Sequence, residues 1–76
     1  VMSNPIITFE EIVRGIGKKQ DNDDYNVIFR TKAAFYWIKK EKEDELRILA
    51  DSAKSNSVLT IKCDALSREI LEVKGI

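Results

Sequence analysis

The stretch YNVIFRTKAAFYWIKK, residues 25–40, contains two short segments that are typical of β-strands. Side chains alternate in the first segment, which places Tyr25, Val27 and Phe29 on one side, as expected for a half-buried strand. The second segment, AAFYWIKK, follows after only a few residues. This spacing predicts a β-hairpin centred near Lys32 and Ala33, although the glycine that such turns favour is absent.

The second segment carries large apolar side chains on both faces of its strand. Neighbouring side chains of a strand point to opposite faces, so Phe35 and Trp37 share one face, while the other carries Ala34, Tyr36 and Ile38. A chain of 76 residues rarely has enough layers to cover both faces. In one interpretation, Phe35 and Trp37 enter the core and Tyr36 packs beneath a helix. In the other, one of the two faces is a recognition surface.

A helix is predicted after this hairpin, over about residues 43–54. Apolar residues recur there at helical spacing, at Leu46, Leu49, Ala50 and Ala53. Acidic residues lie near its start and a lysine near its end, which complements the helix dipole. Asn56 can end the helix in place of glycine.

Two further strands are predicted after the helix. SVLTIKCDA, residues 57–65, places Leu59, Ile61 and Cys63 on one face. LSREILEVKGI, residues 66–76, continues the alternation of apolar and polar side chains. A short connection over residues 64–68 then joins the two strands as an antiparallel hairpin.

The segment IITFEEIVRGIGKK, residues 6–19, is compatible with a helix or a strand. Thr8 and Glu11 have the spacing of a capping box, which favours a helix over residues 8–16. Read as a strand, the segment slips in phase between Phe9 and residue 12, and a bulge explains such a slip. Gly15 and Gly17 would then allow the strand to bend, and a bent fifth strand could close the two hairpins into a barrel.

The order of predicted elements resembles that of the OB-fold. The fold class expected from it is mainly β, a five-stranded OB-fold-like Greek-key barrel with one helix between strands three and four. The alternative is an α+β fold of order αββαββ, with helices on one face of an antiparallel sheet. Residues 11–64, chiefly NDDYNV and VLTIKCDA, also resemble the B subunits of Shiga-type AB5 toxins in layout. That resemblance implies a pentameric ring that binds host glycans, but those subunits close an intrachain disulfide, which Cys63 alone cannot form.

The composition is that of one small globular domain. Thirteen basic residues balance thirteen acidic ones, which argues against bulk nucleic acid or an anionic membrane as the main partner. No segment has the length of a membrane span, and the single cysteine slightly favours a reducing, cytoplasmic setting. We expect one OB-like domain over residues 1–76, with residues 1–5 disordered or foreign to the natural domain.

The sequence offers weak support for chemistry. Asp21, Asp23 and Asp24 do not begin a calcium loop, because Asn26 and Lys32 stand where an EF-hand has glycine and glutamate. Histidine is absent, no glycine-rich phosphate loop is present, and Cys63 alternates with core residues. These observations predict a chain that is not an enzyme and that has no cofactor, metal site or catalytic residue.

The function predicted from the sequence is therefore that of a non-enzymatic binding module. Protein contact or self-association through the aromatic strand ranks first, because tyrosine and tryptophan are enriched at such interfaces. Binding of single-stranded nucleic acid ranks second, since basic residues flank the aromatic rings, and glycan binding by a toxin-like ring ranks third. The predicted binding residues are Arg30, Lys32, Tyr36, Trp37 and Lys39.

Overall fold

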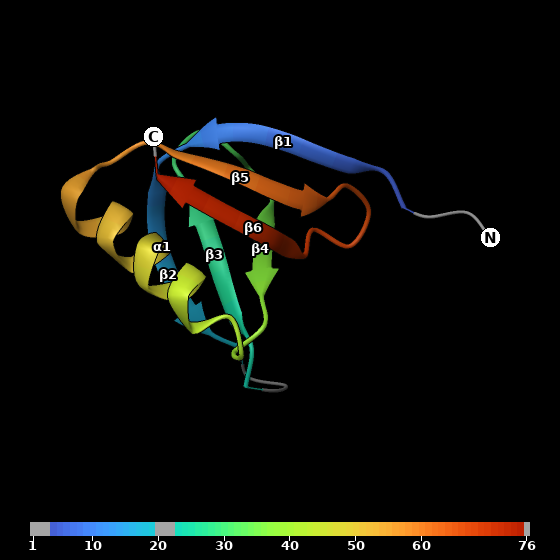
Figure 1. The fold of residues 1–76 in the computed structure, drawn as a ribbon, viewed down its shortest axis with the longest axis horizontal. Helices are drawn as coiled ribbons and strands as arrows, with labels where there is room; N and C mark the ends of the chain where they lie inside the picture. Colours follow the sequence, from blue (N-terminus) through green and yellow to red (C-terminus); the bar gives the residue numbers. More distant parts are fainter. Residues whose placement is uncertain (1–3, 20–22, 76) are drawn as a thin grey trace.

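The computed structural model describes residues 4–19 and 23–75, which form one helix and six strands (Figure 1). In chain order the elements are β1 (Ile6–Glu11), β2 (Val13–Lys18), β3 (Tyr25–Phe29), β4 (Phe35–Ile38), α1 (Glu43–Ser55), β5 (Leu59–Asp64) and β6 (Ile70–Gly75).

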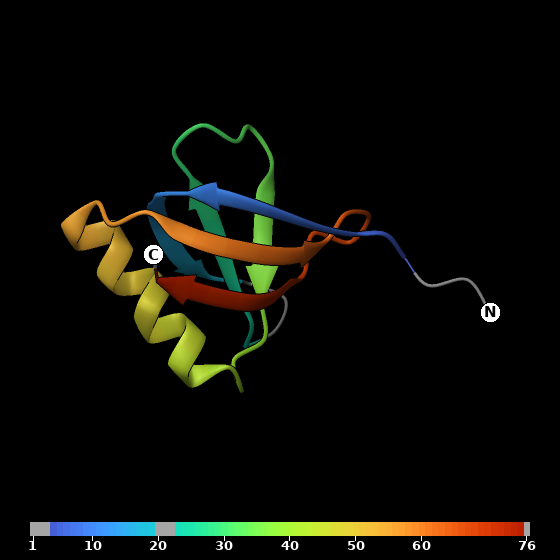
Figure 2. The same ribbon diagram turned by 45° about the horizontal axis from the view of Figure 1, so that its top comes forward.

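The strands form two antiparallel sheets of three strands each. One sheet has the order β1-β5-β6 and the other has the order β2-β3-β4. Figure 2 shows that the strands of the two sheets cross at a steep angle. Orthogonal packing of this kind requires corners at which the chain passes from one sheet to the other.

The corner at the start of the chain lies at Ile12, between β1 and β2. β1 pairs with β5, where Phe9 lies opposite Ile61, and β2 pairs with β3, where Ile16 lies opposite Val27. The carbonyl oxygen of Ile12 accepts a hydrogen bond from the N–H of Arg30, at 3.0 Å. Residues 6–18 are therefore strands, as in the second of the two interpretations of this segment. The helix interpretation of residues 8–16 is wrong, because pairing with two sheets outweighs the local capping-box pattern.

The predicted five-stranded OB barrel is also wrong, as is the αββαββ alternative. The bend at Ile12 divides the first strand into two, which gives six strands in two sheets, and α1 lies between β4 and β5. Between β4 and the start of β6, the described residues form one isolated parallel bridge, from Trp37 to Glu69, rather than a ladder. The two sheets consequently do not close into a barrel.

The local predictions for the two hairpins and the helix are confirmed. β3 and β4 pair as predicted, with Val27 opposite Tyr36, and β5 pairs with β6. The helix α1 runs from Glu43 to Ser55, within one residue of the prediction. It ends at Asn56, whose φ of 61° is left-handed and whose N–H donates to the carbonyl oxygen of Ser52.

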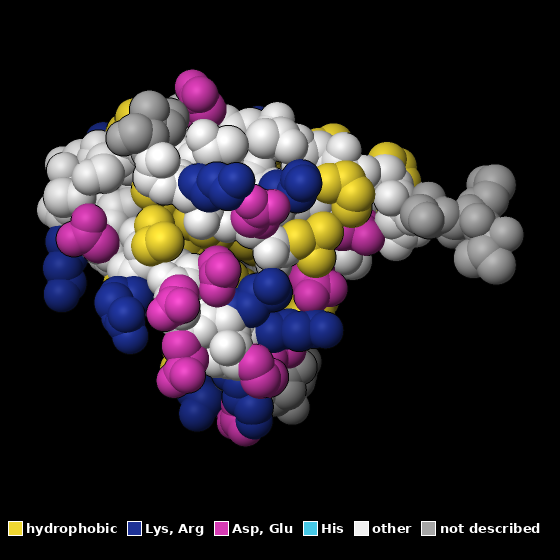
Figure 3. All heavy atoms as spheres, viewed as in Figure 1, with side chains coloured by type: hydrophobic (Ala, Val, Ile, Leu, Met, Phe, Trp, Pro, Cys, Tyr) yellow, Lys and Arg dark blue, Asp and Glu magenta, His cyan; other side chains and the backbone are white. Residues whose placement is uncertain are grey.

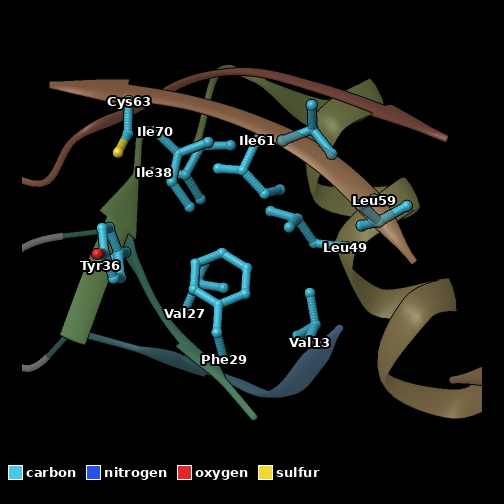
Figure 4. Packing of buried hydrophobic residues seen from close by; sticks show 11 residues of the cluster. Val13, Val27, Phe29, Tyr36, Ile38, Leu49, Leu59, Ile61, Cys63 and Ile70 are labelled. Carbon is cyan, nitrogen blue, oxygen red and sulfur yellow. The ribbon is translucent and has the colours of Figure 1, made fainter. Parts of the chain in front are cut away.

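The core fills the space between the two sheets and is closed on one side by α1 (Figure 4). Leu49 of the helix is fully buried and Ile38 and Ile61 are buried between the sheets. The full set of buried apolar residues is Val13, Val27, Phe29, Tyr36, Ile38, Leu49, Leu59, Ile61, Cys63, Ile70 and Val73. As expected from the alternation in sequence, Leu59, Ile61 and Cys63 share the buried face of β5.

The expectation that residues 1–5 are disordered or foreign to the natural domain falls partly outside the described residues, because these do not include residues 1–3. Asp21 of the acidic turn also lies outside the described residues. Asn4 donates a hydrogen bond to Asp64, and the carbonyl oxygen of Pro5 accepts one from Ala65. Asp23 forms ion pairs with Lys40, at 2.9 Å, and with Lys18, at 3.6 Å.

Candidate functional site

The aromatic strand β4 directs its side chains to two different environments. Tyr36 and Ile38 point into the core, and Phe35 and Trp37 point to the outer face of the β2-β3-β4 sheet. This is the reverse of the interpretation that placed Phe35 and Trp37 inside. The pairing of Tyr36 with the buried Val27 explains the orientation, since residues opposite each other in a ladder share a face.

Tyr36 is a core residue that packs against two phenylalanines. Its ring centroid lies 5.2 Å from that of Phe29 and 5.6 Å from that of Phe9, and the two phenylalanines are 5.4 Å apart at nearly a right angle. Burial raises the pKa of the Tyr36 hydroxyl. Of the five predicted binding residues, Tyr36 is thus the one that its own chain buries.

Trp37 is half-buried by contacts within its own chain. Its Nε1–H donates to the carbonyl oxygen of Ser67 at 2.9 Å, and its backbone N–H donates to the carbonyl oxygen of Arg68 at 3.1 Å. The ammonium group of Lys19 lies 4.9 Å from the ring centroid, within the range of a cation–π contact. The connection between β5 and β6 therefore covers part of the outer face of the aromatic strand.

The three predicted basic residues diverge to separate partners. Arg30 donates to the side chain of Asn56 beyond the end of α1. The ammonium group of Lys32 lies 4.6 Å from the ring centroid of Phe9, and that of Lys39 lies 3.6 Å from a carboxylate oxygen of Glu69. Charges of both signs also intermingle on the face shown in Figure 3. The structure therefore does not bring Arg30, Lys32 and Lys39 together in a single basic stripe such as a nucleic-acid backbone needs.

Phe35 is an exposed aromatic residue that is not among the five binding residues predicted from the sequence. Its side chain is 65% exposed. Figure 2 shows that the connection from β3 to β4, just before Phe35, stands clear of the other strands. The signal was present in the sequence, because the apolar phase of Val27 and Phe29, carried across the hairpin, places Tyr36 inside and Phe35 outside.

Glu11 anchors the base of that exposed connection. Its carboxylate accepts hydrogen bonds from the hydroxyl of Thr31 and from the N–H of Ile12, and the residue is only 7% exposed. Burial opposes its ionisation, but these hydrogen bonds and the charge of Lys32 outweigh burial and lower the pKa of Glu11. In the sequence Glu11 stands out only as part of a capping box with Thr8, and that pattern does not indicate this role.

Cys63 and Ser52 also carry reactive or polar groups in the interior, and the contacts of both are structural. Burial, followed by the charge of Asp64, raises the pKa of the Cys63 thiol, which is fully buried. Ser52 of α1 is also fully buried, and its hydroxyl accepts from the N–H of Val13 at 3.1 Å and donates to the carbonyl oxygen of Ser57 at 2.6 Å. The bond with Val13 ties the helix to the corner between β1 and β2, and the bond with Ser57 ties it to the segment that follows the helix.

An open groove of about 440 Å3 separates α1 from the sheet on the side of β2 and β3. Its lining mixes apolar and charged side chains, which are Ile16, Tyr25, Lys40, Glu43, Leu46, Arg47 and Ala50. In the described residues, no group of three histidine, cysteine or acidic side chains is placed to hold a metal ion. No helix in the described ranges is long and apolar enough to cross a membrane.

Comparison with known proteins relates this chain to an enzyme precursor. No protein-family model and no curated protein matches it. Among solved structures, pro-protein-glutaminase is similar over 93% of this chain, with 30% sequence identity and a TM-score of 0.82. A mutant of pro-protein-glutaminase is similar over 95% of this chain, with 28% identity and a TM-score of 0.83. The chain spans about a quarter of the length of these solved chains, 26% in each case.

These matches correct the functional interpretation of the sequence. The suspected resemblance to Shiga-type toxin B subunits is wrong, since the similar structures are forms of an enzyme precursor. The prediction of a non-enzymatic binding module, with nucleic-acid or glycan binding as alternatives, is overturned by the same finding. The expectation that the chain is not an enzyme is contradicted by the same matches, which are to an enzyme precursor.

Proposed function

We propose that this chain is a domain of an enzyme precursor of the protein-glutaminase type, and that it acts as the pro-part that restrains the catalytic part. The observation that carries the proposal is the match to pro-protein-glutaminase over nearly the whole of this chain but only a quarter of the precursor. A glutaminase that acts on proteins hydrolyses the side-chain amide of glutamine and releases ammonia.

The chemistry of the described residues favours a restraining role over a catalytic one for this quarter of the precursor. Amide hydrolysis of this kind needs an activated nucleophile that can reach the substrate. Cys63, the only cysteine of the chain, is fully buried, and burial raises the pKa of its thiol, so the reactive thiolate is disfavoured. We therefore place the nucleophile in the rest of the precursor.

The protein partner expected from the sequence is then the catalytic part of the same precursor. Phe35 and Trp37 supply apolar surface on one sheet face, and the exposed β3–β4 connection adjoins that surface. Aromatic residues of this kind are common anchors of protein interfaces. Of the residues predicted from sequence, Trp37 is retained in this proposed interface, while the buried Tyr36 supports the face from within.

An assay of ammonia release tests this function. The isolated chain is incubated with a glutamine-rich protein substrate, alone and together with mature protein-glutaminase. We expect the chain alone to release no ammonia and the enzyme to slow progressively as the concentration of added chain rises. Ammonia release by the chain alone, or an enzyme rate that is unaffected by the chain, would contradict the proposal.

A further inference from the structure

Strand β2 contains two glycines that the fold itself does not require. Neither Gly15 nor Gly17 has a positive φ, and the bend of the chain lies earlier, at Ile12. A Cβ atom added to either glycine would meet no atom of another described residue within 4 Å. Gly15 adjoins a register shift in the ladder, but Gly17 lies in regular pairing. Glycine weakens a strand, and in a strand interior it often marks a place where another backbone approaches closely.

The register of the sheet places each glycine at the end of a row that crosses three strands. Gly15 lies opposite Ile28, which lies opposite Phe35. The second row joins Gly17, Asn26 and Trp37 in the same way. Residues opposite one another share a face, so both rows lie on the outer face of the β2-β3-β4 sheet.

On this outer face, β2 presents backbone without side chains at its two glycines, and β4 presents aromatic rings. The intervening Val27 and Phe29 of β3 point the other way, into the core. Figure 1 shows β2, β3 and β4 behind β5 and β6, so that the outer face is turned away from the second sheet. Phe35, at the start of β4, is 65% exposed. The face therefore combines open space above β2 with an unburied aromatic anchor on β4.

We propose that this outer face receives the catalytic part of the precursor, whose main chain crosses β2 at Gly15 and Gly17 and whose apolar side chains contact Ile28 and Phe35. The proposal rests on the function proposed above and specifies the surface that carries it. About three quarters of each similar precursor lies outside the matched segment, which supplies a covalently linked occupant. Lys19, which lies over Trp37, adds a cation for carbonyl or carboxylate oxygens of that occupant.

Replacing either glycine with valine tests the docking surface separately from the folding of the chain. Gly17→Val and Gly15→Val place in the open space above β2 a side chain that suits a strand and whose Cβ atom meets no atom of another described residue within 4 Å. Gly75→Val is the matched control, because Gly75 also lies in a strand, in the other sheet, with no described atom near an added Cβ. Phe35→Ala removes the anchor from an exposed position and provides a second route to the same result.

The measurement is the concentration of added chain that halves ammonia release by mature protein-glutaminase. We expect this concentration to rise at least tenfold for Gly17→Val, Gly15→Val and Phe35→Ala and to stay unchanged for Gly75→Val. Thermal unfolding of each isolated variant should match or exceed that of the wild-type chain, apart from a small change for Phe35→Ala.

The outcomes distinguish this surface from the function on which it rests. A wild-type chain that fails to inhibit would overturn the proposed function and the docking surface together. A wild-type chain that inhibits, with the three face variants equally potent, would overturn the docking surface alone. Self-association of the wild-type chain that the glycine variants abolish, with inhibition unchanged, would make the face a contact between copies and would also overturn the proposal.

Discussion

At the scale of the residue, Glu11 is the clearest case of a charged group that the fold surrounds. The hydroxyl of Thr31 and the N–H of Ile12 bind its carboxylate at the base of the β3–β4 connection. These hydrogen bonds and the charge of Lys32 outweigh the effect of burial and hold the pKa of Glu11 below its usual value. A carboxyl group whose pKa is depressed by folding contributes stability above its unfolded pKa and loses it as the pH falls through the folded pKa.

Glu11→Gln should therefore destabilise the chain at pH 7 by about 2 kcal/mol, the usual scale for a lost hydrogen bond to a charged group. The difference from the wild-type chain should shrink as the pH falls from the unfolded pKa of a glutamate through the lower folded pKa of Glu11, because the wild-type carboxyl then binds a proton. Urea unfolding of both chains at pH 7 and pH 3 measures this. Glu10→Gln, at the neighbouring exposed carboxyl, is the control, and an equal effect there would refute the special role of Glu11.

Residue identities predicted some orientations and not others. The alternation of β3 and β5 correctly indicated which side chains are buried, because each strand has one face on the core. β4 carries apolar side chains on both faces, so its own pattern could not settle the orientation of Tyr36 and Trp37. Only the pairing with Val27 resolves it.

At the scale of the element, the ends of α1 differ in how well they are capped. Asn56 ends the helix in a left-handed conformation. Lys42 at the other end makes no side-chain capping hydrogen bond, although acidic residues fill the first turn. Serine at an N-cap can accept a hydrogen bond from a free N–H of the first turn, which lysine cannot do.

Lys42→Ser should accordingly stabilise the chain by about 1 kcal/mol, the typical value of an N-cap. The readout is the midpoint of urea unfolding. Lys54→Ser, at the last turn of the same helix, removes a lysine that favours the dipole and should have the opposite sign. If Lys42→Ser left the midpoint unchanged or lowered it, the N-terminus of α1 would have to be capped in another way.

The elements with short-range signals were predictable, and the one that depends on distant partners was not. The helix and the two hairpins were found because periodicity and turn residues are local. Residues 6–18 carry a local capping box, yet they pair with β3 and with β5, whose residues lie far along the chain. The corner at Ile12 is decided by those pairings and by Ser52, so the sequence could not reveal that the sheet is divided in two.

At the scale of the whole molecule, the equal numbers of basic and acidic residues, and the mixture of positive and negative side chains on the surface, did not indicate a ligand. A domain that acts on a part of its own precursor needs only a complementary surface, and such a surface carries no local motif. The two glycines of β2 were visible in the sequence, but their meaning depends on the register that sets Gly15 beside Ile28 and Phe35.

The most direct test of the pro-domain function is a chimeric precursor in which this chain replaces the matching quarter of pro-protein-glutaminase. Covalent linkage raises the effective concentration to about the millimolar range, so even weak docking becomes visible. The rate of ammonia release is measured before and after a specific protease cuts the junction and the chain is removed. We predict a low rate before the cut and a rate equal to that of the mature enzyme afterwards. A chimera that is already as active as the mature enzyme before the cut would contradict the account.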